Sequence, residues 1–231
     1  MRAVVFVNGE VRDYPALRGW LRPGDYLIGA DGGTRHILAL GLRPDAVVGD
    51  LDSLEAETVA ELLAAGVAVE RYPIAKDQTD LELAIERGLT VQASEIRLLG
   101  ALGGRLDQTL ANLLILAQRN WPVPLRLAEG DQLAQILRGG ECLTLHAAPG
   151  STVSAIPLSP LVTGITYAGL QYPLVDATLT LGSTRGVSNV VASSPASVTI
   201  REGVLLVVCV TEPETIKQPK KPRQDLQDSQ D

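Results

Sequence analysis

The segment Ala46-Val47-Val48-Gly49-Asp50-Leu51-Asp52-Ser53 joins a short apolar run to two acidic side chains. Its first part, Ala46–Gly49, predicts a buried strand, because it is apolar and bounded by a turn signal. Residues i and i+2 of an extended strand end point the same way, so we expect Asp50 and Asp52 to face one side. Two carboxylates held together are difficult to explain as a stability feature but suit a divalent cation. The segment therefore predicts a strand that ends at a metal site.

The same strand-and-turn pattern recurs over the first 130 residues. The expected strands are Ala3–Val7, Tyr26–Ala30, Ala46–Gly49, Val67–Tyr72, Ile96–Gly100 and Leu125–Ala128. Amphipathic helical patterns lie between several of them. One pattern places Leu110, Leu113, Leu114 and Ala117 on a single helix face, which we expect to be buried. Alternating strands and helices predict an α/β fold, with a mostly parallel sheet and helices on its faces.

The pattern changes after about Asp131, where short strands are separated by Gly, Pro and Ser turns. The strands expected there are Leu143–Leu145, Thr152–Ile156, Thr178–Leu181, Ser197–Arg201 and Leu205–Val210. No segment of this part has a helical pattern. We therefore predict an α/β domain at residues 1–130, an all-β sandwich or barrel at 131–212 and a disordered tail at 213–231.

The composition excludes several classes of protein. A net charge of −7 argues against a nucleic-acid partner, whereas a nucleotide remains compatible because bound metal ions can invert the local field. The N-terminal residues do not form a signal peptide, and no apolar run approaches the ~18 residues that cross a bilayer. The prediction is a soluble, cytoplasmic protein without membrane association. Cys142 and Cys209 lie in apolar runs, so we expect both to be buried, reduced thiols.

Three more polar segments follow predicted strands. They are Asp31-Gly32-Gly33-Thr34, Lys76-Asp77-Gln78-Thr79-Asp80 and Gly103-Gly104-Arg105-Leu106-Asp107-Gln108. Parallel strands point the same way, so these segments should gather at one edge of the sheet, where α/β proteins bind ligands. Many carboxylates and few imidazoles or thiols favour Mg²⁺, or Mn²⁺, over zinc.

Each of these segments also has a purely structural interpretation. Asp107 ahead of a helical pattern suits an N-cap, and Thr79 with Glu82 forms a capping box. Gly32 and Gly33 suit a plain turn as well as the approach of the backbone to a phosphate. The pattern is neither G-x-G-x-x-G nor Walker A, which argues against a Rossmann dehydrogenase and a P-loop kinase.

Two cations accompany the acidic segments. Lys76 is the only lysine before the tail, and its place beside Asp77 and Asp80 fits a phosphate contact or a stray surface lysine. Arg105, in a glycine-rich loop at the same edge, can grip phosphate with its planar fork. We therefore expect this edge to bind phosphate as well as metal.

Taken in order, these segments resemble the thiamin pyrophosphokinase family. The match continues with Gly169-Leu170-Gln171-Tyr172-Pro173-Leu174 and Gly186-Val187-Ser188-Asn189, and it spans nearly everything except the tail. The resemblance implies transfer of diphosphate from ATP to the hydroxyl of thiamin, giving thiamin diphosphate and AMP. It also implies a C-terminal β-sandwich and a homodimer, with thiamin between the catalytic edge of one subunit and the β domain of the other.

The resemblance further implies roles for particular residues. For Mg²⁺ the implied ligands are Asp50, Asp52 and Asp80, and Arg105 and Asp107 are implied as catalytic groups nearby. For ATP they are Asp31, Gly32, Gly33, Asp77 and Gln108, with Lys76 as a candidate phosphate ligand. For the pyrimidine of thiamin they are Ser188 and Asn189, with Arg185 beside them. Either Asp80 or Asp107 would accept the hydroxyl proton.

Two positions depart from the family pattern. Some relatives stack a tryptophan of the last strands on thiamin, whereas Trp20 and Trp121 both precede the β region here. Many bacterial members have an acidic residue after the Ser-Asn pair, where this chain has Val190. Two other functions stay open: a pyrophosphokinase for another primary alcohol, such as a hydroxymethylpterin, and a non-catalytic sensor of Mg-nucleotide.

Overall fold

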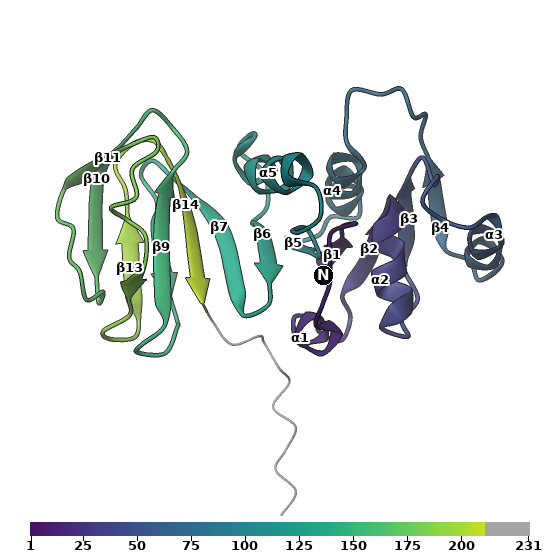
Figure 1. Cartoon of the computed structure of the whole chain (residues 1–231), viewed down its shortest axis with the longest axis horizontal. Coiled ribbons are helices and arrows are strands. Elements are labelled where there is room, and N and C mark those ends of the chain that lie inside the picture. Colours follow the sequence, from purple (N-terminus) through teal and green to yellow (C-terminus); the bar gives the residue numbers. More distant parts are fainter. Residues whose placement is uncertain (211–231) are drawn as a thin grey trace, which may run out of the picture.

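The computed structural model describes residues 1–210, so the predicted disordered tail lies outside the described residues. One large sheet runs across the molecule, and a smaller sheet packs on part of it (Figure 1). In spatial order the large sheet contains β12 (Asn189–Val190), β9 (Thr152–Pro157), β14 (Val204–Val210), β7 (Gln132–Arg138), β6 (Leu125–Glu129), β5 (Glu95–Leu99), β1 (Arg2–Phe6), β2 (Tyr26–Ala30), β3 (Ala46–Gly49) and β4 (Ala68–Arg71).

The parallel half of the molecule consists of adjacent strands that all run the same way, in the spatial order β4, β3, β2, β1, β5 and β6. The helices of this half are α1 (Tyr14–Gly19), α2 (Thr34–Ala39), α3 (Ala56–Ala64), α4 (Asp80–Thr90) and α5 (Leu106–Leu114), with 3₁₀ turns η1 (Asp31–Gly33) and η2 (Ile115–Ala117). The predicted α/β fold is therefore confirmed. Within residues 1–210, no helix combines the length and the apolar character that crossing a membrane requires.

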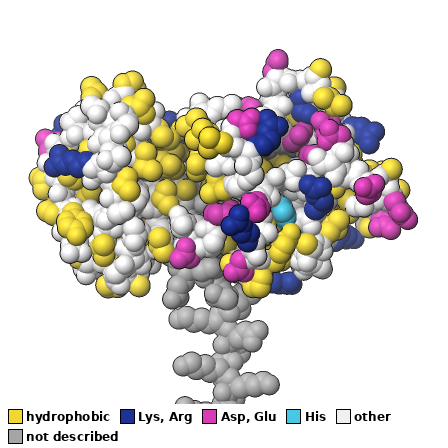
Figure 2. All heavy atoms as spheres, viewed as in Figure 1, with side chains coloured by type: hydrophobic (Ala, Val, Ile, Leu, Met, Phe, Trp, Pro, Cys, Tyr) yellow, Lys and Arg dark blue, Asp and Glu magenta, His cyan; other side chains and the backbone are white. Residues whose placement is uncertain are grey.

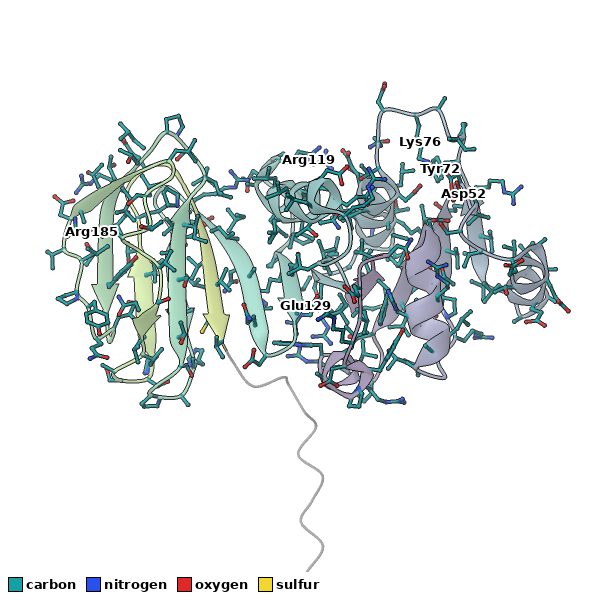
Figure 3. The ribbon with its side chains drawn as sticks, in the orientation of Figure 1. Asp52, Tyr72, Lys76, Arg119, Glu129 and Arg185 are labelled. Atoms are coloured by element: carbon teal, nitrogen blue, oxygen red, sulfur yellow. The ribbon has the colours of Figure 1, made fainter. Side chains whose placement is uncertain are left out.

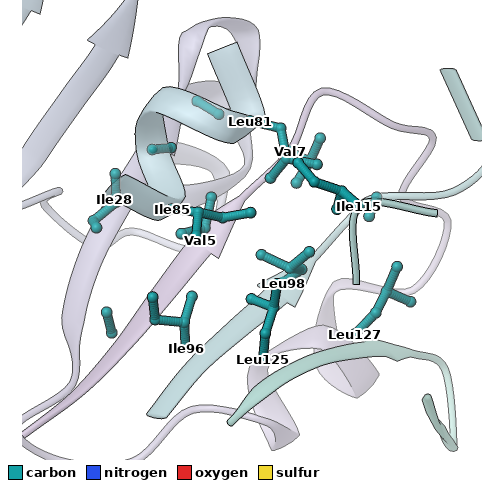
Figure 4. Close-up of a cluster of buried hydrophobic side chains, with 14 of the residues drawn as sticks. Val5, Val7, Ile28, Leu81, Ile85, Ile96, Leu98, Ile115, Leu125 and Leu127 are labelled. Carbon is teal, nitrogen blue, oxygen red and sulfur yellow. The ribbon is translucent and has the colours of Figure 1, made fainter. Parts of the chain in front are cut away.

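Helices cover both faces of the parallel half. On one face, α4 buries Leu81 and Ile85 against Val5 and its neighbours (Figure 4). On the other face, Phe6 packs in a cluster with Trp20. Strands covered on both sides are apolar at nearly every position, because each side chain meets a buried layer. This arrangement leaves the loops at the carboxyl ends of the strands free to form a site.

The antiparallel half begins where β7 turns back along β6. Its small sheet contains, in order, β11 (Ala177–Thr180), β10 (Leu161–Ala168), β13 (Ala196–Thr199) and β8 (Cys142–Leu145). Val153 and Leu205 of the large sheet share a buried cluster with Val162 and Val198 of the small one, so the two sheets pack face to face. The expected β-rich region is confirmed. Because the β6–β7 ladder crosses the predicted boundary after residue 130, the division into two domains stays a prediction.

Three strands of the antiparallel half were not predicted, namely β7, β10 and β12. Strand β10 carries a bulge between Val162 and Ile165, and Gly164 lies there at φ 66°. A bulge adds an extra residue to one strand and shifts the alternation of apolar and polar positions. The sequence of β10 therefore lacks the regular alternation of apolar and polar residues by which a strand is recognised.

The prediction of a buried face on the helix near Leu110 is wrong for Leu110 and Leu114, whereas Leu113 packs against the core and Ala117 is half-buried. Leu110 is 51% exposed and Leu114 is 54% exposed. Helix α5 ends at Leu114 and continues as the 3₁₀ turn η2, which has a tighter period and buries Ile115 and Leu116 instead. Three apolar side chains of α5 form an exposed ridge, which consists of Leu106, Leu110 and Leu114.

The two cysteines differ in environment. Both are free, but Cys142 is exposed and Cys209 is buried. The prediction of a buried thiol is therefore confirmed for Cys209 and wrong for Cys142. Cys142 begins β8, an edge strand of the small sheet, where only alternate side chains reach the core.

Candidate active site

A cavity of about 690 Å³ opens at the carboxyl ends of the parallel strands. Each of the four polar segments contributes to its lining, which includes Asp31, Asp50, Asp52, Lys76, Asp80, Arg105, Asp107 and Gln108. Figure 2 shows charged side chains concentrated over the parallel half on the face in view, and Figure 3 places Asp52 and Lys76 at one end of it. The acidic cavity, as we call it, brings together the residues that the parallel topology predicted to meet.

Three carboxylates lie close together in this cavity. Oxygen atoms of Asp31, Asp50 and Asp80 are all within 4.8 Å of one another. Asp31 is only 7% exposed, and its Oδ1 is buried without a hydrogen-bond partner among residues 1–210. Mg²⁺ prefers hard oxygen ligands, and these three carboxylates, one of them with an unpartnered oxygen, form a ligand set that fits this ion. We call this group the carboxylate cluster.

Two backbone features allow the carboxylate cluster to form. Gly49 has φ 151°, and a Cβ there would lie 2.9 Å from the Cβ of Asp31 and 3.2 Å from the Cγ of Asp80. Only glycine therefore lets these two side chains approach the end of β3. Asp31 itself has φ 44°, a region that non-glycine residues rarely occupy. Strain of this kind persists where the surrounding structure imposes it, and functional sites are common places for it.

Asp52 lines the acidic cavity but is not part of the carboxylate cluster. The expectation of an extended chain through Asp50 and Asp52 is wrong, because Leu51 has φ 66° and turns the backbone. The backbone N–H of Asp52 donates to Asp50 Oδ1 at 3.2 Å, and Asp52 Oδ1 accepts from Ser53 Oγ at 3.1 Å. Asp31, from a different strand end, lies beside Asp50 instead.

Lys76 places its ammonium group against the carboxylate cluster. Its Nζ lies 3.0 Å from Asp80 Oδ1 and 4.0 Å from Asp50 Oδ2. Burial raises the pKa of Asp80; the bond to Lys76 opposes this rise, and the neighbouring Asp50 and Asp31 add to it. Positive charge is therefore supplied where several negative groups meet, at a point that phosphate oxygens can also reach.

Arg105 and Asp107 bind each other at the mouth of the acidic cavity. Arg105 Nη2 donates to Asp107 Oδ2 at 2.6 Å, and Arg105 Nε donates to Oδ1 at 3.1 Å. This bidentate bond lowers the pKa of the exposed Asp107 carboxyl. Arg105, not Asp107, occupies the N-cap position of α5, so the N-cap interpretation of Asp107 is wrong. The cap predicted at Thr79 is confirmed, since its Oγ1 accepts from Glu82 N–H.

Gly32 and Gly33 lie behind the acidic cavity and do not line it. A Cβ on Gly33 would lie 2.0 Å from Phe6 O, and one on Gly32 would lie 2.5 Å from Asn8 Nδ2. Close packing of η1 against the end of β1 therefore requires both glycines, and this packing aims Asp31 into the cavity. Asp77 is exposed and lies outside the lining.

The acidic cavity also contains two amide side chains that the sequence reasoning did not include, Asn8 and Asn112. Asn8 Oδ1 accepts from Arg35 at 2.8 Å, and the buried Asn112 donates to Ala101 O at 2.7 Å. Asn8 precedes Gly9, and this pair is typical of a plain turn. Asn112 was detectable as a polar residue within an otherwise apolar helical segment.

A second cavity, of about 370 Å³, lies in the antiparallel half and brings two motifs together. Its lining residues are Tyr167, Tyr172, Pro173, Leu174, Arg185, Val187, Ser188 and Asn189. The candidate thiamin residues Arg185, Ser188 and Asn189 are thus close in space. We call this the aromatic cavity. Figure 3 shows Arg185 at the opposite end of the molecule from Lys76.

Two family models match parts of the chain. Residues 19–124 match the family "Thiamin pyrophosphokinase, catalytic domain", and residues 143–205 match "Thiamin pyrophosphokinase, vitamin B1 binding domain". The thiamine pyrophosphokinase of Bacillus subtilis (strain 168) is 30% identical over 92% of this chain and 100% of the relative.

Solved structures are also similar. A crystal structure of thiamine pyrophosphokinase from Bacillus subtilis aligns with a TM-score of 0.82 at 28% identity, covering 92% of this chain and 100% of that one. A crystal structure of thiamin pyrophosphokinase from Geobacillus thermodenitrificans aligns with a TM-score of 0.77 at 30% identity, covering 91% and 98%.

Proposed function

The chain belongs to the thiamin pyrophosphokinase family, and from this premise we propose how its own residues carry out the reaction. The reaction transfers the terminal diphosphate of ATP to the hydroxyl of thiamin. A bond forms between the hydroxyl oxygen and the β-phosphorus, the bond from that phosphorus to the AMP oxygen breaks, and the hydroxyl proton passes to a base. The observation that carries the proposal is the carboxylate cluster beside Lys76 in the acidic cavity.

Mg²⁺ would be held by Asp50 and Asp80, with Asp31 as the third carboxylate and Asp52 on the cavity wall. When bound, the ion neutralises phosphate charge and stabilises the charge that develops on the leaving AMP. The buried and unpartnered Oδ1 of Asp31 supports its inclusion among the ligands. Phosphoryl chemistry depends mainly on positioning and charge, so the cluster would supply the principal catalytic effect.

Lys76 and Arg105 would bind the phosphates of ATP, with Gln108 on the same wall. Lys76 offers a compact charge next to the cluster, and Arg105 offers a planar fork at the cavity mouth. Of the two carboxylates considered as the base, Asp107 is the weaker proton acceptor, because its bidentate bond to Arg105 lowers its pKa.

The aromatic cavity would bind thiamin, and we infer that the acceptor reaches ATP only in a homodimer. The two cavities lie at opposite ends of one chain, so a single chain cannot bring both substrates together (Figure 3). The acidic cavity of one protomer would face the aromatic cavity of its partner. The exposed ridge of α5 and the 76% exposed Ile74 offer apolar surface for such a contact.

The reaction is tested by measuring AMP release from ATP, with and without thiamin, in Mg²⁺ and in EDTA. We expect release that requires both thiamin and the metal. A hydroxymethylpterin in place of thiamin should give none. AMP release with the pterin alone, or nucleotide binding by calorimetry without AMP release under either acceptor, would contradict the proposal.

A site shared between two protomers is tested by mixing two impaired variants, Asp50→Asn and Tyr172→Ala, and measuring AMP release at low thiamin concentration. In a shared site, half of the dimers are mixed and one of their two sites carries neither change. Activity should therefore recover to about one quarter of wild type. If the activity of the mixture is no greater than the sum of the activities of the two separate variants, each chain uses its own two cavities.

A further inference from the structure

A third cavity, of about 450 Å³, lies where the parallel half meets the antiparallel half. Its lining comes from the chain between η2 and β6, from β7 and from the start of β8, and it shares no residue with the acidic cavity or the aromatic cavity. Cavities of about 300–1,000 Å³ are the usual size of small-molecule sites, so this one has room for more than a single small ion. The lining includes Arg119, Arg126 and Arg138, and we therefore call it the arginine cavity. Figure 3 labels Arg119 between Arg185 and Lys76, which lie at the two ends of the molecule.

Two of the three arginines already have an acidic partner. Arg126 Nη1 lies 2.7 Å from Glu95 Oε2, and Arg119 forms an ion pair with Glu86. Neither glutamate lines the cavity, so each carboxylate holds its arginine from outside the lining. The charge that the cavity offers to a ligand therefore depends mainly on Arg138.

Arg138 carries a positive charge that no carboxylate of the described chain neutralises. Its residue is half-buried, and its Nη2 donates to two backbone oxygens, Ala117 O and Arg119 O. No ion pair joins its guanidinium to an acidic side chain within residues 1–210. Glu141, the one acidic residue of the lining, uses its Oε2 to accept from the backbone N–H of Arg138 at 2.8 Å. A half-buried guanidinium without a counter-ion favours an anion, and its planar fork fits the oxygens of a phosphate.

Arg119 and Trp121 form a flat surface beside Arg138. The Cζ atom of Arg119 lies over the Trp121 ring, 4.1 Å from its centroid. The Arg119 side chain is 48% exposed, which leaves part of its guanidinium open to a ligand. Because the backbone oxygen of Arg119 accepts from Arg138 Nη2, this surface adjoins the unpaired charge. A guanidinium stacks on aromatic rings but repels a cationic one, so the surface suits a neutral flat ring.

We propose that the arginine cavity binds a small phosphate ester that carries a neutral flat ring. Arg138 binds the phosphate group, and the ring lies against the guanidinium of Arg119. The site is separate from both cavities of the proposed reaction, so the proposal stands or falls independently of whether the chain acts on thiamin.

Cys142 provides a local probe of occupancy. It is an exposed, free thiol in the lining, whereas Cys209 is buried, so iodoacetamide should alkylate Cys142 first. AMP, a phosphate ester with a neutral flat ring, is the ligand used, and EDTA is present throughout to remove metal from the acidic cavity. A ligand that fills the arginine cavity covers the thiol, so AMP at about 10 times its Kd should slow the alkylation of Cys142 about 10-fold. If AMP does not slow this alkylation, the proposal is overturned.

Inorganic phosphate and adenosine test the two parts of the ligand separately. Each should protect Cys142 less than AMP does at the same concentration, because each makes only one of the two contacts. Equal protection by adenosine and AMP would overturn the phosphate site at Arg138. Equal protection by inorganic phosphate and AMP would overturn the ring surface at Arg119.

Two variants test the residues themselves. Arg138→Gln should raise the AMP concentration needed for half-maximal protection about 10-fold to 100-fold, because a charge-assisted hydrogen bond is lost. Arg43→Gln is the matched control, since Arg43 also donates to a backbone oxygen, Ala65 O, but is exposed and outside the lining. Asn120→Asp changes an exposed residue of the lining, so it should stay folded while its added carboxylate weakens AMP binding.

The variants also separate this site from the substrate sites. Arg138→Gln should leave the KM for ATP and for thiamin unchanged, because Arg138 lines neither the acidic cavity nor the aromatic cavity. A raised KM for ATP in this variant would show that the arginine cavity is part of the substrate site and would overturn the proposal of a separate one. Unchanged protection by AMP in both Arg138→Gln and Asn120→Asp would overturn the assignment of the phosphate to Arg138.

Discussion

The acidic cavity and the aromatic cavity are assembled in different ways. The acidic cavity collects residues from Val7 to Asn112, because each parallel strand delivers its following loop to one rim. The aromatic cavity collects residues only from Tyr167 to Asn189, since antiparallel strands return to their neighbours after short turns. The acidic cavity is lined by charged side chains held close together. The aromatic cavity is lined by tyrosine rings and one cation, Arg185. This difference separates catalysis from acceptor recognition, so damage to each cavity should change a different kinetic constant.

The largest effect is expected from Asp50→Asn, which removes charge from the carboxylate cluster. We expect kcat to fall by about 10²–10³, as for the loss of one electrostatic stabiliser, while the KM for thiamin changes little. Steady-state kinetics in saturating Mg²⁺ measure both constants. Glu57→Gln, an exposed carboxylate on α3, is the control. A rise in the KM for thiamin at constant kcat would contradict the assignment of catalysis to the acidic cavity and of acceptor binding to the aromatic cavity.

A smaller effect is expected from Gly49→Ala, because the added Cβ collides with Asp31 and Asp80. We expect kcat to fall about 10-fold and the free energy of unfolding to fall by about 1–3 kcal/mol. Gly24→Ala is the matched control: Gly24 also has positive φ, but a Cβ there meets nothing within 4 Å. Gly24→Ala should cost about 1 kcal/mol of stability and leave kcat intact. Equal kcat values for both variants would show that the carboxylates do not need their close approach.

An effect on stability alone, with no change in a kinetic constant, is expected in alkaline solution and concerns Tyr167 of the aromatic cavity. The folded-state pKa, raised from 10.0 to about 12 by burial, exceeds the unfolded value. Stability is therefore retained below pH 10 and lost as the pH rises towards 12, by about 2–3 kcal/mol at most. Tyr167→Phe cannot ionise and should lose less stability over this range. Urea unfolding of both proteins at several pH values measures the difference, and parallel pH curves would contradict it.

Much of the acidic cavity was predictable because its signals are local. Ala46–Gly49 and Tyr26–Ala30 are strands with the bounds expected, and the polar segment after each lies at the rim. The contribution of Asp31 to the carboxylate cluster was not predictable, because it depends on the approach of two strand ends past Gly49. The exposed face of α5 was also missed: a helical period shows which residues share a face, and the tertiary arrangement decides whether anything covers it.

The sequence by itself determined the α/β order of elements, the rim at which Asp50 and Asp80 meet, and the family to which the motifs belong. Hydrophobic period, turn residues and strand direction are properties of short segments, so they are visible without coordinates. Only the tertiary structure decided that Asp52 lies apart from the carboxylate cluster and that Asn189 binds the backbone of Tyr172. Those contacts depend on a positive φ at Leu51 and on the pairing of distant turns, which the packing of the whole chain imposes.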